Sequence, residues 1–198
     1  LMTPFFNPGP NPYGAPKVYL AAVGELMTEV AGEVADGLLI HPFTTERYLR
    51  EVTVPALERG LAKSGRTLES YPISYGGLIA TGGNDDARAD AVTAVKGQIA
   101  FYGSTPAYRP VLELHGWGEL QSELNALSRR GEWTKMGELV NDDVADAFSV
   151  IAQPGDVGGV VEGRFGDLIS RFSIYAPYAL DDDVRRAIIA SVRASSSR

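Results

Sequence analysis

The sequence contains no cysteine, which excludes disulfides, thiolate nucleophiles and zinc–sulfur sites. It has only two histidines, His41 and His115, which are too few for a histidine-rich metal site. Basic residues are also scarce, 18 against 25 acidic ones, and the formal net charge is −7. Nucleic acids and anionic membranes bind to basic faces, so we expect neither of them as a partner.

Long apolar runs are absent as well. No stretch approaches the roughly 20 residues that span a bilayer, and the first residues show no signal-peptide pattern. We therefore expect a cytoplasmic protein without a membrane segment. Of the 198 residues, 44% are hydrophobic and 22% are charged, which is the composition of an ordinary globular domain with its own core.

The most informative stretch runs from Lys17 to Phe43 and reads as strand, glycine turn, helix and strand. Val18–Ala22 is a short apolar run that ends before Gly24. Gly37–Ile40 is a second such run. A strand, a helix and a strand this close together predict a parallel βαβ unit. The apolar positions of the intervening helix recur three and four residues apart, and we expect them to be buried: Leu26, Met27, Val30, Ala31 and Val34.

Two further segments, Ile73–Ala80 and Phe172–Tyr175, have the composition of strands. Thr44 or Thr45, Asn84 and Asn141 are candidate N-caps of helices, and Pro55 predicts a break near Val54. The helix after Asn141 is expected to bury Val144, Ala147, Phe148 and Ile151. Short helices are also predicted over 157–165 and 181–192.

These elements predict an α/β fold with four parallel strands, each followed by a helix. We interpret residues 1–198 as a single domain, with a proline-rich loop over 1–16 and a helical insertion over 104–140. Four strand–helix units are half of a (β/α)8 TIM-type barrel, which needs about 250 residues. An open four-stranded sheet is the alternative.

The turn at Gly24 is the first candidate site. Glycine lets a backbone approach a ligand, and the unpaired N–H groups at the start of the next helix suit a phosphate. The alternative is that Gly24 only makes a tight turn, because one glycine is far weaker than a full dinucleotide-binding motif.

Three other polar residues also have a functional and a structural interpretation. His41 follows a predicted strand, where barrel enzymes place their chemistry, so it is a candidate cofactor or substrate contact. The alternative is a histidine bonded to nearby backbone. His115 is expected to be structural or exposed. Glu25 is expected to favour the helix N-terminus rather than to bind a ligand.

Several segments carry a resemblance to a known family: PKVYLAAVGELMTEVAGEVADGLLIHPF, TTERYLREVTVPALERGLAKSGR and NDDVADAFSVIAQPGDVGGVVEGRFGDLISRFSIYAP. They resemble the bacterial luciferase-like monooxygenase superfamily, and most of all its actinobacterial branch that depends on the deazaflavin coenzyme F-420. The resemblance covers nearly the whole chain and is weakest over 104–140.

The resemblance implies a TIM-type barrel that binds a flavin or deazaflavin at the carboxyl ends of its strands. This chain matches strands five to eight. The turn formed by Val23, Gly24, Glu25, Leu26 and Met27 falls where family members hold the cofactor phosphate, and His41 lies at the same face. The first four strands are missing from the match. In the family they carry much of the ring pocket and most residues proposed for catalysis, so the catalytic residues remain unknown.

Three functions follow as hypotheses. The first is an oxidoreductase that transfers hydride with coenzyme F-420 and a small-molecule substrate. The second is an FMN-dependent monooxygenase of the same fold. The third is a non-catalytic half-barrel that binds a partner. Because a half-barrel exposes two sheet edges, we expect a homo-oligomer or pairing with a missing N-terminal half.

Overall fold

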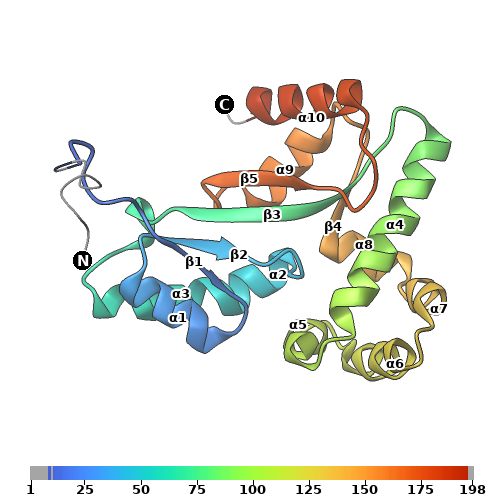
Figure 1. Cartoon of the computed structure of the whole chain (residues 1–198), viewed down its shortest axis with the longest axis horizontal. Helices are drawn as coiled ribbons and strands as arrows, with labels where there is room; N and C mark the ends of the chain where they lie inside the picture. Colours follow the sequence, from blue (N-terminus) through green and yellow to red (C-terminus); the bar gives the residue numbers. More distant parts are fainter. Residues whose placement is uncertain (1–8, 10, 196–198) are drawn as a thin grey trace.

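The computed structural model describes residue 9 and residues 11–195, and it shows one parallel sheet with helices around it (Figure 1). The strands follow the order β1-β2-β3-β4, and β5 pairs with β3. All four pairings of the described strands are parallel, and the three that join the predicted strands confirm the prediction. The strands are β1 (Tyr19–Ala22), β2 (Gly37–Ile40), β3 (Ile73–Ala80), β4 (Ser149–Ile151) and β5 (Arg171–Tyr175).

The helices begin where the capping residues predict. The side chains of Thr45, Asn84 and Asn141 each accept a hydrogen bond from a backbone N–H three residues later. A π-helical turn over 49–53 precedes Pro55, which marks the predicted break. The α-helices are α1 (Glu25–Val34), α2 (Glu46–Tyr48), α3 (Val54–Lys63), α4 (Asp85–Gly103), α5 (Arg109–Glu113), α6 (Gly118–Arg129), α7 (Trp133–Glu138), α8 (Asp142–Phe148), α9 (Val157–Phe165) and α10 (Asp182–Ser195). No helix among the described residues combines the length and apolarity that a bilayer crossing requires.

The strand β3 lies between its neighbours. Tyr75 is the Cα partner of Ile40 in β2 and of Phe172 in β5, so these two strands flank β3. Leu78 pairs with Ser149 in β4 and with β5. The short β4 therefore continues on the same side of β3 as β2, beyond the end of β2.

Helices cover one face of the sheet. Leu38 and Ile73 pack with residues of α1 and α3, whereas Tyr75 and Ile79 pack with residues of α9 and α10. The helices α1 and α3 lie unusually close together, since a Cβ added to Gly60 would overlap the backbone carbonyl of Glu29. A side chain at Gly60 would force the backbones of α1 and α3 apart.

The opposite face is open over the amino-terminal part of the sheet. Leu39 is 41% exposed there, and Ala21, Arg171 and Ser173 are exposed as well. The guanidinium of Arg171 on β5 lies 5.7 Å from the ring centroid of Tyr19 on β1, across the intervening strands. This face of the sheet would be interior in a closed barrel.

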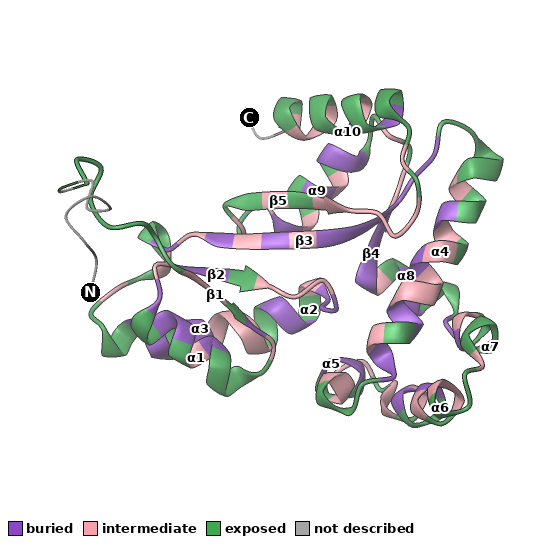
Figure 2. Ribbon diagram, viewed as in Figure 1, coloured by how far each residue is buried: buried purple, intermediate pink, exposed green. Residues whose placement is uncertain are grey.

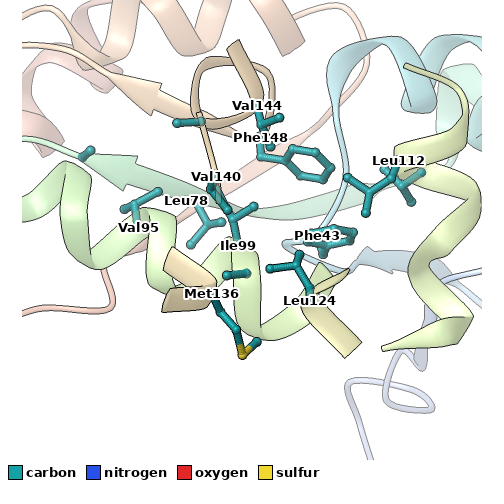
Figure 3. Close-up of a cluster of buried hydrophobic side chains, with 14 of the residues drawn as sticks. Phe43, Leu78, Val95, Ile99, Leu112, Leu124, Met136, Val140, Val144 and Phe148 are labelled. Carbon is teal, nitrogen blue, oxygen red and sulfur yellow. The ribbon is translucent and has the colours of Figure 1, made fainter. Parts of the chain in front are cut away.

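The segment 104–140 packs onto α4 rather than forming a core of its own. Leu112, Leu124 and Met136 share a hydrophobic cluster with Ile99 of α4 and Leu78 of β3 (Figure 3). We call this segment, with α4 and α8, the helical lobe. Its packing places residues from the middle of the chain near the carboxyl ends of the strands.

The prediction for the apolar face of α1 was wrong in four of its five residues. Ala31 is buried, but Leu26 and Val34 are 81% and 70% exposed, and Met27 and Val30 are 47% and 41% exposed (Figure 2). The small side of the helix, with Thr28, Ala31 and Gly32, packs against its neighbours instead. We call the exposed residues Leu26, Met27, Val30 and Val34 the α1 stripe.

The prediction of a helix from Asn141 to Ile151 was also wrong at its end. The helix α8 stops at Phe148, and Ser149–Ile151 form β4. The side chain of Phe148 is buried, as expected. Pairing with the end of β3 outweighs helix propagation in these three residues.

The α1–α3 contact gives a stability prediction. We expect Gly60→Ala to lower the free energy of unfolding by about 1–3 kcal/mol, because the new methyl group meets rigid backbone. Gly97→Ala in α4 is the matched control, since a Cβ there meets nothing within 4 Å, and it should gain up to about 1 kcal/mol. Urea denaturation measures both, and equal effects would contradict the close approach.

Candidate functional site

The carboxyl ends of β1 and β2 lie side by side, because the two strands are parallel. Ala22, the last residue of β1, is the Cα partner of Ile40, the last residue of β2. Val23 and His41 therefore begin neighbouring turns, roughly 5 Å apart at the spacing of adjacent strands. Ligands of parallel α/β sheets and barrels bind outside this edge.

The turn at Gly24 leaves the start of α1 without a side-chain cap. Gly24 is the N-cap residue, with φ −103° and ψ 164°, and no side chain of the described residues caps the first-turn N–H groups. A Cβ built on Gly24 would meet nothing within 4 Å, and residues 24–27 are exposed. Free N–H groups facing open space at a helix start are a geometry that receives phosphate.

The side chains that follow Gly24 are paired with another helix or exposed to solvent. The carboxylate of Glu25 forms an ion pair with Arg59 of α3 at 3.1 Å, and Leu26 and Met27 belong to the exposed α1 stripe. These three residues can reach a ligand at the turn through their backbone. The phosphate site over 23–27 stays a prediction.

His41 lies in a defined hydrogen-bond arrangement. Its Nδ1 accepts a hydrogen bond from the backbone N–H of Phe43 at 3.1 Å, and its Nε2 lies 3.2 Å from the hydroxyl oxygen of Tyr108. Its ring packs against the rings of Tyr102 and Tyr108, at centroid distances of 4.8 and 4.9 Å. Burial lowers the pKa of His41, which favours the neutral ring.

A pair of tyrosine hydroxyls lies beside His41. The hydroxyl oxygens of Tyr102, at the end of α4, and Tyr175, at the end of β5, are 3.1 Å apart. Burial, then the hydrogen bond to Tyr175, raises the pKa of Tyr102 to about 12. Tyr102 therefore stays protonated at neutral pH and acts as a hydroxyl donor or acceptor, not as a phenolate.

The sequence did not indicate the tyrosines of this site. Tyr175 ends a correctly predicted strand, so the rule that pointed to His41 could have pointed to Tyr175 as well. Tyr102 and Tyr108 carry no such signal, because the helical lobe brings them to His41 from more than 60 positions away. His115 is elsewhere: its Nε2 lies 2.8 Å from Thr45 Oγ1, and its ring stacks on Trp117.

Two buried hydroxyls near the ends of β2 and β3 have no hydrogen-bond partner among the described residues: Thr44 Oγ1 and Thr81 Oγ1. Buried hydroxyls are nearly always paired, so such atoms mark places where water or a polar ligand completes the structure. The described residues contain no group of three or more histidines and carboxylates that could hold a metal ion.

Comparison with known proteins identifies the family. The sequence profile of the luciferase-like monooxygenases matches residues 1–165. The chain belongs to this family. An uncharacterized protein of Mycobacterium tuberculosis is 52% identical over 171 residues, which are 86% of this chain and 50% of that protein. The 5,10-methylenetetrahydromethanopterin reductase of Archaeoglobus fulgidus is 31% identical over 77% of this chain and 44% of its own length.

Two solved structures show the same fold. The coenzyme F-420-dependent tetrahydromethanopterin reductase of Methanopyrus kandleri superposes with a TM-score of 0.69 at 22% identity, over 88% of this chain and 49% of that one. An F-420-dependent secondary alcohol dehydrogenase, solved with an F-420–acetone adduct, gives 0.64 at 18% identity, over 93% and 50%. The predicted barrel fold class is thereby confirmed, and the chain spans about half the length of the relatives it matches.

The two histidines predict how stability changes with pH. Burial lowers the pKa of His41 below its ordinary 6.5, and burial, then repulsion from Arg47, lowers that of His115. The folded state thus favours the neutral rings, so their contribution to stability is complete above pH 6.5 and is lost as pH falls below it.

We expect the free energy of unfolding to decrease between pH 7 and pH 5.5, where histidine is the main titrating side chain. A variant with His41→Gln and His115→Gln should show a flatter profile over the same interval. Denaturation curves at several pH values test this, and a wild-type protein that gains stability on acidification would contradict the lowered pKa values.

Proposed function

We propose that the protein is an oxidoreductase that transfers hydride with coenzyme F-420 to or from a small-molecule substrate. The observation that carries the proposal is the uncapped start of α1 beside His41 at the carboxyl edge of the sheet. Support comes from the family match and from neighbours whose names specify F-420.

The residues at this edge fit a cofactor with a phosphate and a polar ring. The backbone N–H groups after Gly24 would hold the phosphate, favoured further by the helix dipole. His41 and the nearby tyrosines would border the ring, and Thr81 Oγ1 is an unpaired polar group at the same edge. When bound, F-420 supplies the hydride chemistry, and the protein supplies binding and orientation.

FMN is the alternative cofactor, because the family is described as monooxygenases and FMN also carries a phosphate that the start of α1 could receive. A monooxygenase would bind FMN in preference to F-420. Titration with each cofactor, followed by its own absorbance and fluorescence, separates the two proposals. A chain that binds neither would favour a non-catalytic half-barrel.

The turn itself can be tested by mutation. We expect Gly24→Val to weaken F-420 binding about tenfold or more, because the branched side chain covers the N–H groups that would hold the phosphate. The fold should survive, since the space around Gly24 is open. Fluorescence titration measures binding, and circular dichroism checks the fold.

Gly155→Val is the matched control. Gly155 also precedes a helix, α9, and a Cβ there likewise meets nothing within 4 Å. It should leave binding unchanged. If Gly155→Val weakens binding and Gly24→Val does not, the phosphate lies at α9 rather than at α1.

The α1 stripe and the free sheet edges suggest that the chain works with additional strand–helix units. Among the described strands, β1 pairs only with β2, and β5 only with β3. The stripe lies on the helix that follows β1. We propose that a further half-barrel covers these surfaces, either the remaining half that the relatives contain or a second copy of this chain.

We expect the 198-residue chain alone to self-associate and to lack turnover with F-420 or FMN, because barrel catalysis uses residues from several strand ends. Replacing Leu26 and Val34 by Glu should reduce self-association, whereas Leu139→Glu, at an exposed leucine of the helical lobe, should not. Light scattering measures both. A wild-type chain that is monomeric at all concentrations, or that turns over by itself as a monomer, would contradict the proposal.

A further inference from the structure

Four aromatic side chains from separate parts of the chain meet at the carboxyl edge. His41 follows β2, Tyr102 lies in the last turn of α4, Tyr108 ends the 3-10 turn over 106–108, and Tyr175 ends β5. The ring centroids of Tyr102 and Tyr108 are 6.3 Å apart, and both rings contact His41. All four side chains are partly exposed, so a ligand can reach the group. We call these residues the tyrosine–histidine cluster.

The hydrogen bonds fix the direction of the His41–Tyr108 pair. Because the N–H of Phe43 donates to Nδ1 of His41, that nitrogen carries no proton. A neutral imidazole then carries its proton on Nε2, and Nε2 must donate to the hydroxyl oxygen of Tyr108. The reverse direction would require both ring nitrogens to be acceptors, which a neutral imidazole cannot provide.

The hydroxyl proton of Tyr108 is consequently not used in the hydrogen bond with His41. Its oxygen accepts from His41, and no acceptor for its proton is found among the described residues. Nearby, one proton satisfies the contact between the hydroxyls of Tyr102 and Tyr175. None of the ring contacts and hydrogen bonds of these four residues in the described part of the chain involves lysine or arginine.

We infer that Tyr108 donates its hydroxyl proton in a hydrogen bond to a carbonyl oxygen of a bound ligand, and that His41 positions it for this. The surrounding aromatic rings and the lack of cationic partners favour an uncharged ligand group. The inference rests on the proposed function and specifies its substrate class: hydride adds to a carbonyl carbon, and the C=O electron pair moves to oxygen. The hydrogen bond stabilises that developing charge, and a solvent proton completes the alcohol.

The carbonyl oxygen could belong to the reacting compound or to the deazaflavin ring, and binding measurements distinguish them. The 198-residue chain is titrated with F-420 by fluorescence and with carbonyl-13C-labelled cyclohexanone by NMR. Tyr108→Phe keeps the ring and removes the donor. It should lower the affinity for one of the two ligands about five- to tenfold, which corresponds to the loss of one hydrogen bond. The labelled carbonyl resonance should shift on binding to the wild type and less in the variant if the ketone is the acceptor.

Variants of His41 test its positioning role. In His41→Gln the amide N–H2 can take the place of Nε2–H, so binding should stay within about twofold of the wild type. In His41→Asn the shorter side chain reaches only the Nδ1 position, so the affinity for the ligand should fall as much as it does in Tyr108→Phe. His115→Gln, at the other histidine, is the control and should change neither ligand.

The histidine tautomer gives a readout independent of ligands. Long-range 1H–15N spectra at pH 7.5 should show His41 protonated at Nε2 only, and a proton on Nδ1 would overturn the inference. The inference is also overturned if Tyr108→Phe binds both F-420 and cyclohexanone as tightly as the wild type does. It is overturned as well if the wild type does not bind the ketone and Tyr108→Phe leaves F-420 binding unchanged. If the wild type does not bind F-420 but its ketone binding depends on Tyr108, the proposed F-420 chemistry fails, whereas the hydrogen bond from Tyr108 to a ligand carbonyl stands.

Discussion

The parallel pairing of β3 is the constraint on which the rest of the described structure depends. Its eight residues pair with three other strands. Successive side chains point to opposite faces, so Tyr75 and Ile79 join the helices on one face, whereas Leu78 and Ala80 join the helical lobe on the other. A slip of one residue would exchange these two sets. The register of β3 therefore fixes the packing of the helices and the position of the lobe together.

The candidate site combines a local part with a distant one. The β1–β2 register alone places His41 beside the turn at Gly24. Tyr102 and Tyr108 depend on the lobe, which contacts the strand ends partly through the stacked rings of Phe43 and Phe148, 4.4 Å apart. The Gly24 turn follows β1, and the β1–β2 register that places it involves neither of these rings. The turn at Gly24 and the tyrosine–histidine cluster therefore depend on different contacts.

The sequence predicted what short-range patterns determine. Four strands, three N-caps and the turn at Gly24 follow from residues within a few positions of one another. It failed where the outcome depends on distant partners. β4 was missed because its three residues continue an apolar helical pattern without a glycine or proline, and only pairing with β3 makes them a strand. Tyr108 could not be linked to His41, 67 positions away.

The error on α1 has a different cause. Its apolar spacing marks one surface of the helix, but periodicity does not say whether another element of this chain packs on that surface. In this chain α3 packs against the side of α1 that carries small residues. A Cβ atom added to Gly32 there would lie only 2.5 Å from the carbonyl oxygen of Leu57. The larger apolar side remains exposed, and β1, which precedes this helix, pairs only with β2 among the described strands. In a closed ring of strand–helix units every helix has a neighbour on each side, so one additional unit beside β1 would account for both faces of α1.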